Sequence, residues 1–246
     1  MTESTYRTDL FAHRQALVVG GTGGIGEAVT RALAACGARV TATGATDDEV
    51  ARATVHGERV RVVALDVRDA AAIDAVVAMH ACLDIVVNCA GVIRRGAEHD
   101  PRVFADVLAI NLTGTMQVCT AARPLLAARG GAIVNTASML SFFGGGLVPA
   151  YSASKGGVAQ LSKSLAIAYA GDGIRVNAIA PGWIATVLTE PLQRDEVRNA
   201  AILSRTPLGR WGTPQDVADA VIFLCSPAAR FVTGAVLAID GGYLVA

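Results

Sequence analysis

The chain of 246 residues has few charged side chains and no surplus of either sign. Charged residues make up 17% of the sequence, and Lys plus Arg equals Asp plus Glu at 21 each. Proteins that bind a nucleic-acid backbone use a surplus of Lys and Arg, so we expect no nucleic-acid partner. The chain is instead 52% hydrophobic, which is ample for one large buried core.

Hydrophobic runs of membrane-spanning length are also lacking. The longest apolar stretches, such as residues 161–170, are interrupted by Ser, Lys or Gln before they reach the roughly 20 residues that a span needs. Residues 1–14 contain Glu3, Arg7 and Asp9 without a continuous apolar core, so they do not resemble a secretory signal. We therefore expect no membrane association and a cytoplasmic location, and we interpret residues 1–14 as a short lead-in.

Disulfide and metal patterns are missing as well. The five cysteines are odd in number and scattered, and no CxxC pair occurs. None of the four histidines has metal-ligand spacing to a cysteine. Isolated cysteines in apolar sequence are typical of small core residues in a reducing compartment, so we predict neither disulfides nor a metal site.

What the sequence does contain is an alternation of short apolar runs and helical periodicity. Residues 16–19 form an apolar run that ends in glycines, and Ile25, Val29 and Leu33 follow at helical spacing. Further strands are predicted at residues 39–43, 60–65, 83–87, 132–135, 175–179 and 236–239, with helices that include 70–79, 104–128 and 154–170. Apolar strands separated by helices indicate a parallel sheet that is covered on both faces.

The expected fold is therefore α/β, a single-domain Rossmann-type doubly wound parallel sheet of about seven strands over residues 15–246. Two segments lack regular periodicity, residues 139–150 and residues 186–208. We interpret both as candidate substrate loops, because irregular loops at sheet edges often carry binding residues.

A glycine-rich turn, residues 20–26, joins the first strand to the first helix. Backbone amides at such a turn can face a pyrophosphate, and glycine permits the close approach. Two registers fit. They are GxGxxG at Gly21, Gly23 and Gly26, and GxxxGxG at Gly20, Gly24 and Gly26. On this motif alone, a glycine turn without a ligand stays an alternative.

The end of the second strand leaves the cofactor type open. Rossmann folds typically have an acid there for the ribose hydroxyls, whereas this chain has neither an acid nor an Arg within residues 43–46. NAD and NADP both stay possible, and Asp47 and Asp48 favour NAD because they would repel a 2′-phosphate. Asp66 closes the third strand and could accept a hydrogen bond from the adenine amino group. The alternative is that Asp66 caps the helix that follows.

Tyr151 and Lys155 lie four residues apart at the start of a predicted helix, on one face. An ammonium within about 4 to 6 Å lowers the pKa of a phenol, so Tyr151 could act as a general acid or base. A solvated pair is the alternative for this spacing alone. Ser138 follows a strand at the carboxyl edge of the sheet, where open α/β folds bind ligands. Asn111 lies in an apolar helix, where a buried amide needs partners.

From about residue 16 to its end, the chain resembles the short-chain dehydrogenases/reductases. The order and spacing of the motifs carry the resemblance. They are Gly20, Gly24 and Gly26, then Asn88-Cys89-Ala90-Gly91, Asn111, Ser138, Tyr151, Lys155, Pro181-Gly182 and Thr186. The chain departs from the family at Val19 and Cys89, where Thr and Asn are common, and neither position touches the chemistry. Gly23 stands where NADP-preferring relatives often carry a basic residue.

The resemblance implies an oxidoreductase that transfers a hydride between NAD or NADP and a secondary alcohol or ketone. Tyr151 would be the general acid/base, and Lys155 would lower its pKa and bind the nicotinamide ribose. Ser138 would orient the substrate oxygen, and Asn111 would hold a water in the proton relay. The implied cofactor contacts are Gly20, Thr22, Gly24, Ile25, Gly26, Gly44, Asp66, Val67, Asn88, Ala90, Gly91, Tyr151, Lys155, Pro181, Gly182, Ile184 and Thr186.

The substrate is less defined. Residues 93–95, 139–145, 178–182 and 209–212 resemble the branch that contains 2-deoxy-D-gluconate 3-dehydrogenase and gluconate 5-dehydrogenase. A sugar acid would have a carboxylate that Arg94 or Arg95 could bind through two hydrogen bonds, unless these arginines are solvated or lie in an interface. The candidate substrate contacts are Arg94, Leu140, Phe142 and Trp183.

Two other functions stay open. An apolar pocket could form from Phe142, Phe143, Leu147, Val148, Trp183, Val187 and Leu188. Such a pocket favours reduction of a 3-oxoacyl thioester carried by an acyl carrier protein. A nucleotide-binding regulator without turnover is disfavoured, because the tyrosine, lysine and serine are all present.

The resemblance also implies a homotetramer. The helices at residues 104–128 and 154–170 would form one interface, and the C-terminal strand would form another. A hydrophobic content of 52% is compatible with this assembly, although apolar packing inside a monomer explains it too.

Overall fold

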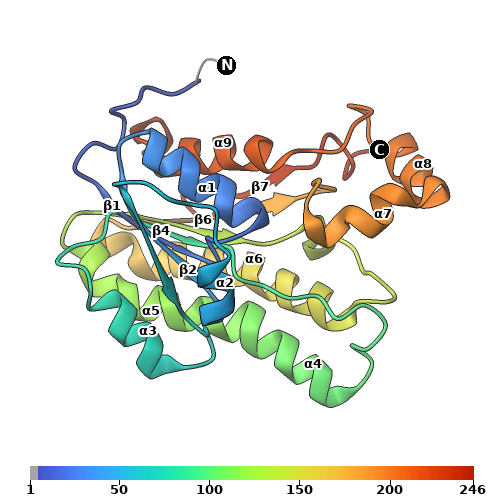
Figure 1. Ribbon diagram of the computed structural model, residues 1–246, viewed down its shortest axis with the longest axis horizontal. Helices are drawn as coiled ribbons and strands as arrows, with labels where there is room; N and C mark the ends of the chain where they lie inside the picture. Colours follow the sequence, from blue (N-terminus) through green and yellow to red (C-terminus); the bar gives the residue numbers. More distant parts are fainter. Residues whose placement is uncertain (1–4) are drawn as a thin grey trace.

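In the computed structural model, which describes residues 5–246, seven parallel strands form one sheet in the order β3-β2-β1-β4-β5-β6-β7 (Figure 1). The strands are β1 Gln15–Val19, β2 Arg39–Gly44, β3 Val60–Ala64, β4 Ile85–Asn88, β5 Ala132–Thr136, β6 Arg175–Pro181 and β7 Val236–Ile239. The strand order reverses between β1 and β4, which confirms the doubly wound fold. Strand ends differ from the predicted ones by at most two residues.

Helices cover both faces of the sheet, as Figure 1 shows. On one face α1 (Gly24–Ala35) packs against α9 (Pro214–Cys225), and the other face carries α3 (Ala70–Val77), α5 (Gly114–Ala127) and α6 (Pro149–Tyr169). Alternate residues of β1 serve the two cores, since Val18 packs with the α1/α9 side and Leu17 with the α5/α6 side. Burial on both faces explains why the strands are continuous apolar runs.

The predicted helix at residues 104–128 is more complex than its periodicity indicates. It consists of α4 (Pro101–Leu108), a π-helical segment (Ala109–Thr113) and α5. The π-helical segment contains Asn111, whose carbonyl oxygen accepts a hydrogen bond from the Thr115 hydroxyl at 2.8 Å. Single π-helical turns are rare and often lie at functional sites. One wide turn does not interrupt an apolar face, so the sequence pattern could not reveal it.

The stretch Pro101–Ala127 is also long and apolar enough to cross a membrane, by length and composition alone. In this structure it lies across the sheet, and Val118, Ala122 and Leu126 are fully buried in the core there. Only 33% of the apolar window in this stretch is buried inside the structure.

Residues 5–14 are part of the domain and not a lead-in outside it. Phe11 is 3% exposed in the α1/α9 core, and its backbone amide donates to the carbonyl of Cys36 at 2.8 Å. The Tyr6 hydroxyl donates to the carbonyl of Asp219 at 2.8 Å. The sequence analysis missed this packing because one aromatic anchor has no periodicity. Residues 1–4 of the predicted lead-in lie outside the described residues.

Of the two segments expected to be irregular, only the first is. Residues 139–148 contain one 3-10 turn, Met139–Ser141, and α6 begins at Pro149, which suits the first position of a helix. The segment 186–208, in contrast, contains α7 (Glu190–Arg194) and α8 (Glu196–Ser204), so its predicted irregularity was wrong. These helices escape detection because α7 buries no residue and α8 buries only Ile202.

Candidate active site

The carboxyl ends of four neighbouring strands converge on the expected site. The glycine turn follows β1, Asn88 ends β4, Ser138 follows β5 and Gly182 follows β6. Parallel strands bring these ends to one edge of the sheet, which is where open α/β folds bind ligands. The first turn of α6 adds Tyr151 and Lys155 to this edge.

The glycine turn requires the GxxxGxG register. Gly20 and Gly24 have positive φ angles of 76° and 53°. A Cβ on Gly20 would lie 2.6 Å from the amide nitrogen of Ala90, and one on Gly26 would lie 2.0 Å from the carbonyl oxygen of Gly20. A Cβ on Gly23 would meet no described atom within 4 Å, so any side chain fits there. The open amides at the start of α1 have no side-chain cap, which suits a pyrophosphate.

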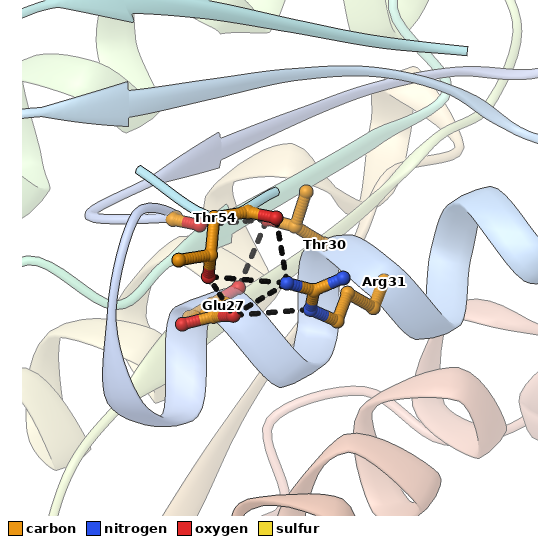
Figure 2. Close-up of polar contacts among 6 residues, drawn as sticks. Glu27, Thr30, Arg31 and Thr54 are labelled. Atoms are coloured by element: carbon orange, nitrogen blue, oxygen red, sulfur yellow. Dashed lines mark hydrogen bonds and ion pairs between the residues drawn. The ribbon is translucent and has the colours of Figure 1, made fainter. Parts of the chain in front are cut away.

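Hydrogen bonds formed by Thr30, Glu27 and Arg31 of α1 stabilise the glycine turn and its surroundings (Figure 2). The hydroxyl of Thr30 lies 2.9 Å from the carbonyl oxygen of Gly26 and 3.2 Å from that of Gly21. On the outer side of α1, Arg31 donates to Glu27 and to the carbonyl of Thr54, and the Thr54 hydroxyl donates to Glu27 at 2.6 Å. These bonds fasten the glycine turn and the segment after α2 (Asp47–Ala51) to the first helix.

The carboxyl end of β2 lies beside an acid that the sequence analysis missed. The Glu49 carboxylate, on α2, accepts the backbone amide of Ala45 at 2.7 Å. A Cβ on Gly44 would lie 3.0 Å from the Cβ of Glu49 and 3.1 Å from the hydroxyl of Thr22. Glu49 therefore brings a negative charge back to the end of β2. The sequence contains a pattern that could have revealed Glu49, because Thr46 and Glu49 have capping-box spacing. In the structure the Thr46 side chain accepts a hydrogen bond from the Glu49 amide at 3.2 Å.

Asp66 does not cap the following helix, so that alternative is wrong. Asp69 caps α3 by accepting the amide of Ala72 at 3.1 Å. Asp66 is paired with Arg68 at 2.7 Å, and this hydrogen bond lowers the pKa of the Asp66 carboxyl. The neighbouring Val67 is buried against Gly114, where a Cβ would lie 2.6 Å from its Cγ2.

Asn88 is held by a second asparagine that the sequence analysis did not identify. The Asn88 side-chain nitrogen donates to the Asn135 Oδ1 at 2.9 Å, and Asn135 in turn donates to the hydroxyl of Ser162 at 3.0 Å. The Oδ1 of Asn88 is buried and has no hydrogen-bond partner within the described chain. A buried acceptor without a partner is unfavourable, so it marks a place for a ligand donor. The only sequence signal for Asn135 is a polar residue inside an apolar strand.

Asn111 binds backbone in this structure. Its Oδ1 accepts the amide of Val92 at 2.8 Å, and its Nδ2 donates to the Val92 carbonyl at 3.0 Å and to the Ser154 hydroxyl at 3.0 Å. Gly91 lies directly beneath, where a Cβ would stand 3.3 Å from the Asn111 Oδ1 and 3.4 Å from the Lys155 Nζ. Asn111 thus holds the chain after Gly91 next to the lysine, and a bulkier residue at position 91 would separate them.

Ser138, Tyr151 and Lys155 form a cluster in which Ser138 and Lys155 are buried and Tyr151 is half-buried. Burial raises the pKa of the Tyr151 phenol, a hydrogen bond with Ser138 opposes this rise, and the charge of Glu98 adds to it. Lys155 donates to the carbonyl of Thr136 at 2.6 Å, and its Nζ lies 5.6 Å from the centroid of the Tyr151 ring. Burial lowers the pKa of Lys155 to about 8. The expected lowering of the Tyr151 pKa is therefore not observed here, because burial outweighs the hydrogen bond with Ser138.

The chain after β6 closes over the glycine turn. Gly182 packs on Asp240, where a Cβ would lie 2.6 Å from the Asp240 Cβ, and Ile184 bridges to Gly212. The Cγ2 of Thr186 is 3.7 Å from the point that a Cβ on Gly24 would take. A cavity of about 570 Å³ lies between the start of α1 and this returning segment.

The candidate substrate residues divide into exposed and packed ones. Arg94 is exposed, Leu140 is half-buried and Phe142 is 55% exposed. Trp183 is packed edge-on against Trp211 and Tyr243, with ring centroids 5.8 and 6.3 Å apart. Of the apolar residues proposed for the pocket, Phe142, Leu147, Val187 and Leu188 are exposed, whereas Val148 is buried.

Comparison with known proteins identifies the family. A family model described as enoyl-(acyl carrier protein) reductase matches residues 20–244. The chain belongs to the short-chain dehydrogenases/reductases. The match covers the glycine turn, the cluster of Ser138, Tyr151 and Lys155 and the returning segment together.

Individual members of this short-chain dehydrogenase/reductase family are similar over nearly the whole chain. A 2-dehydro-3-deoxy-D-gluconate 5-dehydrogenase from Bacillus subtilis (strain 168) is 41% identical over 240 residues, which cover 94% of each chain. A cis-4-hydroxycyclohexanecarboxylate dehydrogenase from Sinomonas cyclohexanicum is 45% identical, covering 96% of this chain and 98% of the relative. A crystal structure from Agrobacterium tumefaciens, provisionally named 2-deoxy-D-gluconate 3-dehydrogenase and containing NADP, has a TM-score of 0.89 at 41% identity over 98% of this chain and 100% of that chain.

As a short-chain dehydrogenase/reductase, the protein is an oxidoreductase that uses a nicotinamide cofactor and acts on secondary alcohols or the corresponding ketones. When bound, the nicotinamide ring accepts or donates the hydride. The residues around it can supply what remains. The Ser138 hydroxyl can hydrogen-bond the substrate oxygen, and the adjoining Tyr151 hydroxyl can take or return its proton.

Proposed function

We propose that this short-chain dehydrogenase/reductase oxidises a secondary alcohol of a hydroxylated carboxylate, of the sugar-acid type, with Tyr151 as general acid/base. One observation carries the proposal. The backbone amides of Tyr151 and Arg94 both donate to the carboxylate of Glu98, each at 2.8 Å. This shared partner connects the backbone of Arg94 to the backbone of Tyr151, and the exposed Arg94 guanidinium forms no ion pair within residues 5–246. Such an arginine suits a substrate carboxylate.

The names of two relatives support this substrate class. Both 2-dehydro-3-deoxy-D-gluconate and cis-4-hydroxycyclohexanecarboxylate combine a carboxylate with a hydroxyl or keto carbon. The second candidate is reduction of a 3-oxoacyl thioester. It is favoured by the exposed apolar side chains of Phe142 and Val187, which would suit an acyl chain.

An absorbance assay of the reduced nicotinamide distinguishes the two. The protein is tested with a sugar acid, the uncharged polyol of equal length and a 3-oxoacyl thioester, together with Tyr151→Phe. We expect turnover of the sugar acid and a loss of about 10³-fold in the variant, the scale of a lost general acid/base. Turnover of the thioester alone would select the second candidate, and full activity of Tyr151→Phe would reject both.

We further propose that the protein prefers NAD. The Glu49 carboxylate accepts a hydrogen bond from the Ala45 amide at the end of β2, and α2 begins with Asp47 and Asp48. A 2′-phosphate bound at this place would therefore be repelled by three negative charges. Titration calorimetry should give a dissociation constant for NADP at least about tenfold above that for NAD. Glu49→Gln should narrow this ratio, whereas Glu58→Gln serves as a distant charge control. Equal affinities in the wild type would contradict the preference.

We propose a homotetramer that works in the cytoplasm. Exposed apolar side chains support assembly, Met116 on α5, Ile167 on α6, and Phe231 and Val245 in the C-terminal part of the chain. Five unpaired cysteines suit a reducing compartment. Light scattering after gel filtration should give four times the mass of one chain, and Ile167→Glu should reduce it.

A further inference from the structure

Glu98 is a buried carboxylate next to the catalytic cluster, on the loop between β4 and α4. Its side chain is 1% exposed. One oxygen accepts the amide of Arg94 and the other accepts the amide of Tyr151, each at 2.8 Å. No Lys, Arg or His within residues 5–246 forms an ion pair with it. A buried carboxylate without a cation costs free energy, and only these two hydrogen bonds offset it.

The bond to Tyr151 meets a need of the catalytic helix. The first amides of a helix have no partner inside it, and Val148 at the start of α6 provides no side-chain cap. Glu98 supplies the missing acceptor from 53 residues earlier in the chain, and its negative charge suits a helix N-terminus. The backbone of the catalytic tyrosine is thus fixed by a side chain outside its own helix.

The bond to Arg94 orders the loop that carries this arginine. The loop has further contacts with the segment before α6, since the amide of Gly96 donates to the carbonyl of Leu147 at 2.8 Å and a ring nitrogen of His99 lies 3.0 Å from the carbonyl of Gly146. These contacts connect the loop that carries Arg94 to the segment before α6. Glu98 joins the arginine directly to the tyrosine.

We propose that Glu98 is a positioning residue whose carboxylate fixes Tyr151 and Arg94 relative to each other, and thereby holds a carboxylate substrate at the distance that proton transfer requires. This inference rests on the proposed roles of Tyr151 and Arg94. It also has an electrostatic consequence. Burial is the largest cause of the raised pKa of Tyr151, and the charge of Glu98 raises this pKa further. The hydrogen bond with Ser138, which follows β5, lowers it. The other charged group near the Tyr151 ring is Lys155, on the same helix.

The substitution Glu98→Gln tests the proposal. Glutamine keeps the size and one accepting oxygen, but it removes the charge and turns an amide donor toward one of the two backbone amides. We expect the KM of a carboxylate substrate to rise about tenfold, as for one lost hydrogen bond to a charged group, with a smaller change for a neutral alcohol. The pH at which oxidation reaches half its maximum should fall by about half a unit to one unit.

Asp100→Asn is the matched control. It removes a negative charge two residues away on the same loop, where the carboxylate caps α4 by accepting the amide of Arg102. This variant should leave both the KM ratio and the pH profile unchanged. Hydrogen exchange provides a readout without substrate, since in Glu98→Gln the backbone amide that faces the glutamine nitrogen, that of Arg94 or that of Tyr151, should lose protection.

The outcomes separate the inference from the proposed function. Wild-type KM values, pH profile and amide protection in Glu98→Gln would overturn the positioning role. An equal rise of KM with charged and neutral substrates, together with an unchanged pH profile, would also overturn the positioning role, because a residue with a merely structural role gives that result. Full turnover by Tyr151→Phe would instead refute the proposed function, and loss of protection at one of the two amides in Glu98→Gln would still establish the link through Glu98.

Discussion

The ammonium of Lys155 lies 2.6 Å from the carbonyl oxygen of Thr136, at the end of the strand that leads to Ser138. The lysine is 3% exposed, and this carbonyl is its close partner. A buried ammonium with so few partners is poorly compensated, which is why its pKa falls to about 8. The buried charge of Lys155 therefore lowers the stability of the folded protein.

Lys155→Met should stabilise the protein without cofactor at pH 7. The unfolded lysine has a pKa of 10.5 and the folded one about 8, so the unfolded chain binds more protons between these values and the free energy of unfolding rises with pH across them. Below pH 8 the full cost of about 3 kcal/mol is present. Loss of the lysine hydrogen bond costs about 1 kcal/mol, so the free energy of unfolding of the variant should be about 2 kcal/mol higher than that of the wild type.

Urea unfolding at pH 7 and at pH 10.5 measures this gain, which should disappear at the higher pH. A destabilised variant at pH 7 would show that the buried charge is compensated. The same substitution should abolish most turnover and weaken nicotinamide binding.

Ser138→Ala should move the pH profile of alcohol oxidation upward. The hydrogen bond with Ser138 opposes the rise of the Tyr151 pKa, so its loss lets that pKa rise further. Oxidation needs the phenolate, which forms above this pKa, and its half-maximal pH should increase by about one unit. The direction is opposite to that expected for Glu98→Gln. A shift of both variants in the same direction would contradict the assignment of Tyr151 as the titrating group.

Gly26→Ala should prevent cofactor binding, whereas Gly23→Ala should be tolerated. A Cβ at position 26 would clash with the carbonyl of Gly20 at 2.0 Å, but a Cβ at position 23 meets no described atom within 4 Å. We expect Gly26→Ala to lose about 2 kcal/mol of stability or more and Gly23→Ala to change it by about 1 kcal/mol or less. Thermal unfolding and titration with NAD measure both. Equal effects would reject the GxxxGxG register.

Arg94→Ala should raise the KM of a carboxylate substrate about tenfold to a hundredfold and leave that of the matching neutral alcohol unchanged. Arg95→Ala is the control, because Arg95 is the adjacent exposed arginine and its backbone is not bound by Glu98. Steady-state kinetics with both substrates measures the ratio. An equal effect of Arg94→Ala on the two substrates would remove the carboxylate hypothesis.

Local patterns in the sequence determined the parallel sheet and the residues of the catalytic cluster. The continuous apolar runs were sufficient for seven strands, because burial on both faces leaves no alternation to misread. The four-residue spacing of Tyr151 and Lys155 was sufficient to place them on one helix face. Both patterns operate over a few residues, so they are visible without the fold.

Only the tertiary structure decided which polar residues support that cluster. Glu98 binds an amide 53 residues away, Asn135 binds Asn88 on the neighbouring strand, and Phe11 enters a core built from distant helices. Glu49 shows the intermediate case, since its capping spacing was visible but its approach to the end of β2 was not. Hydrogen bonds and burial between distant segments depend on where the chain returns, and no local pattern of residue types specifies that return.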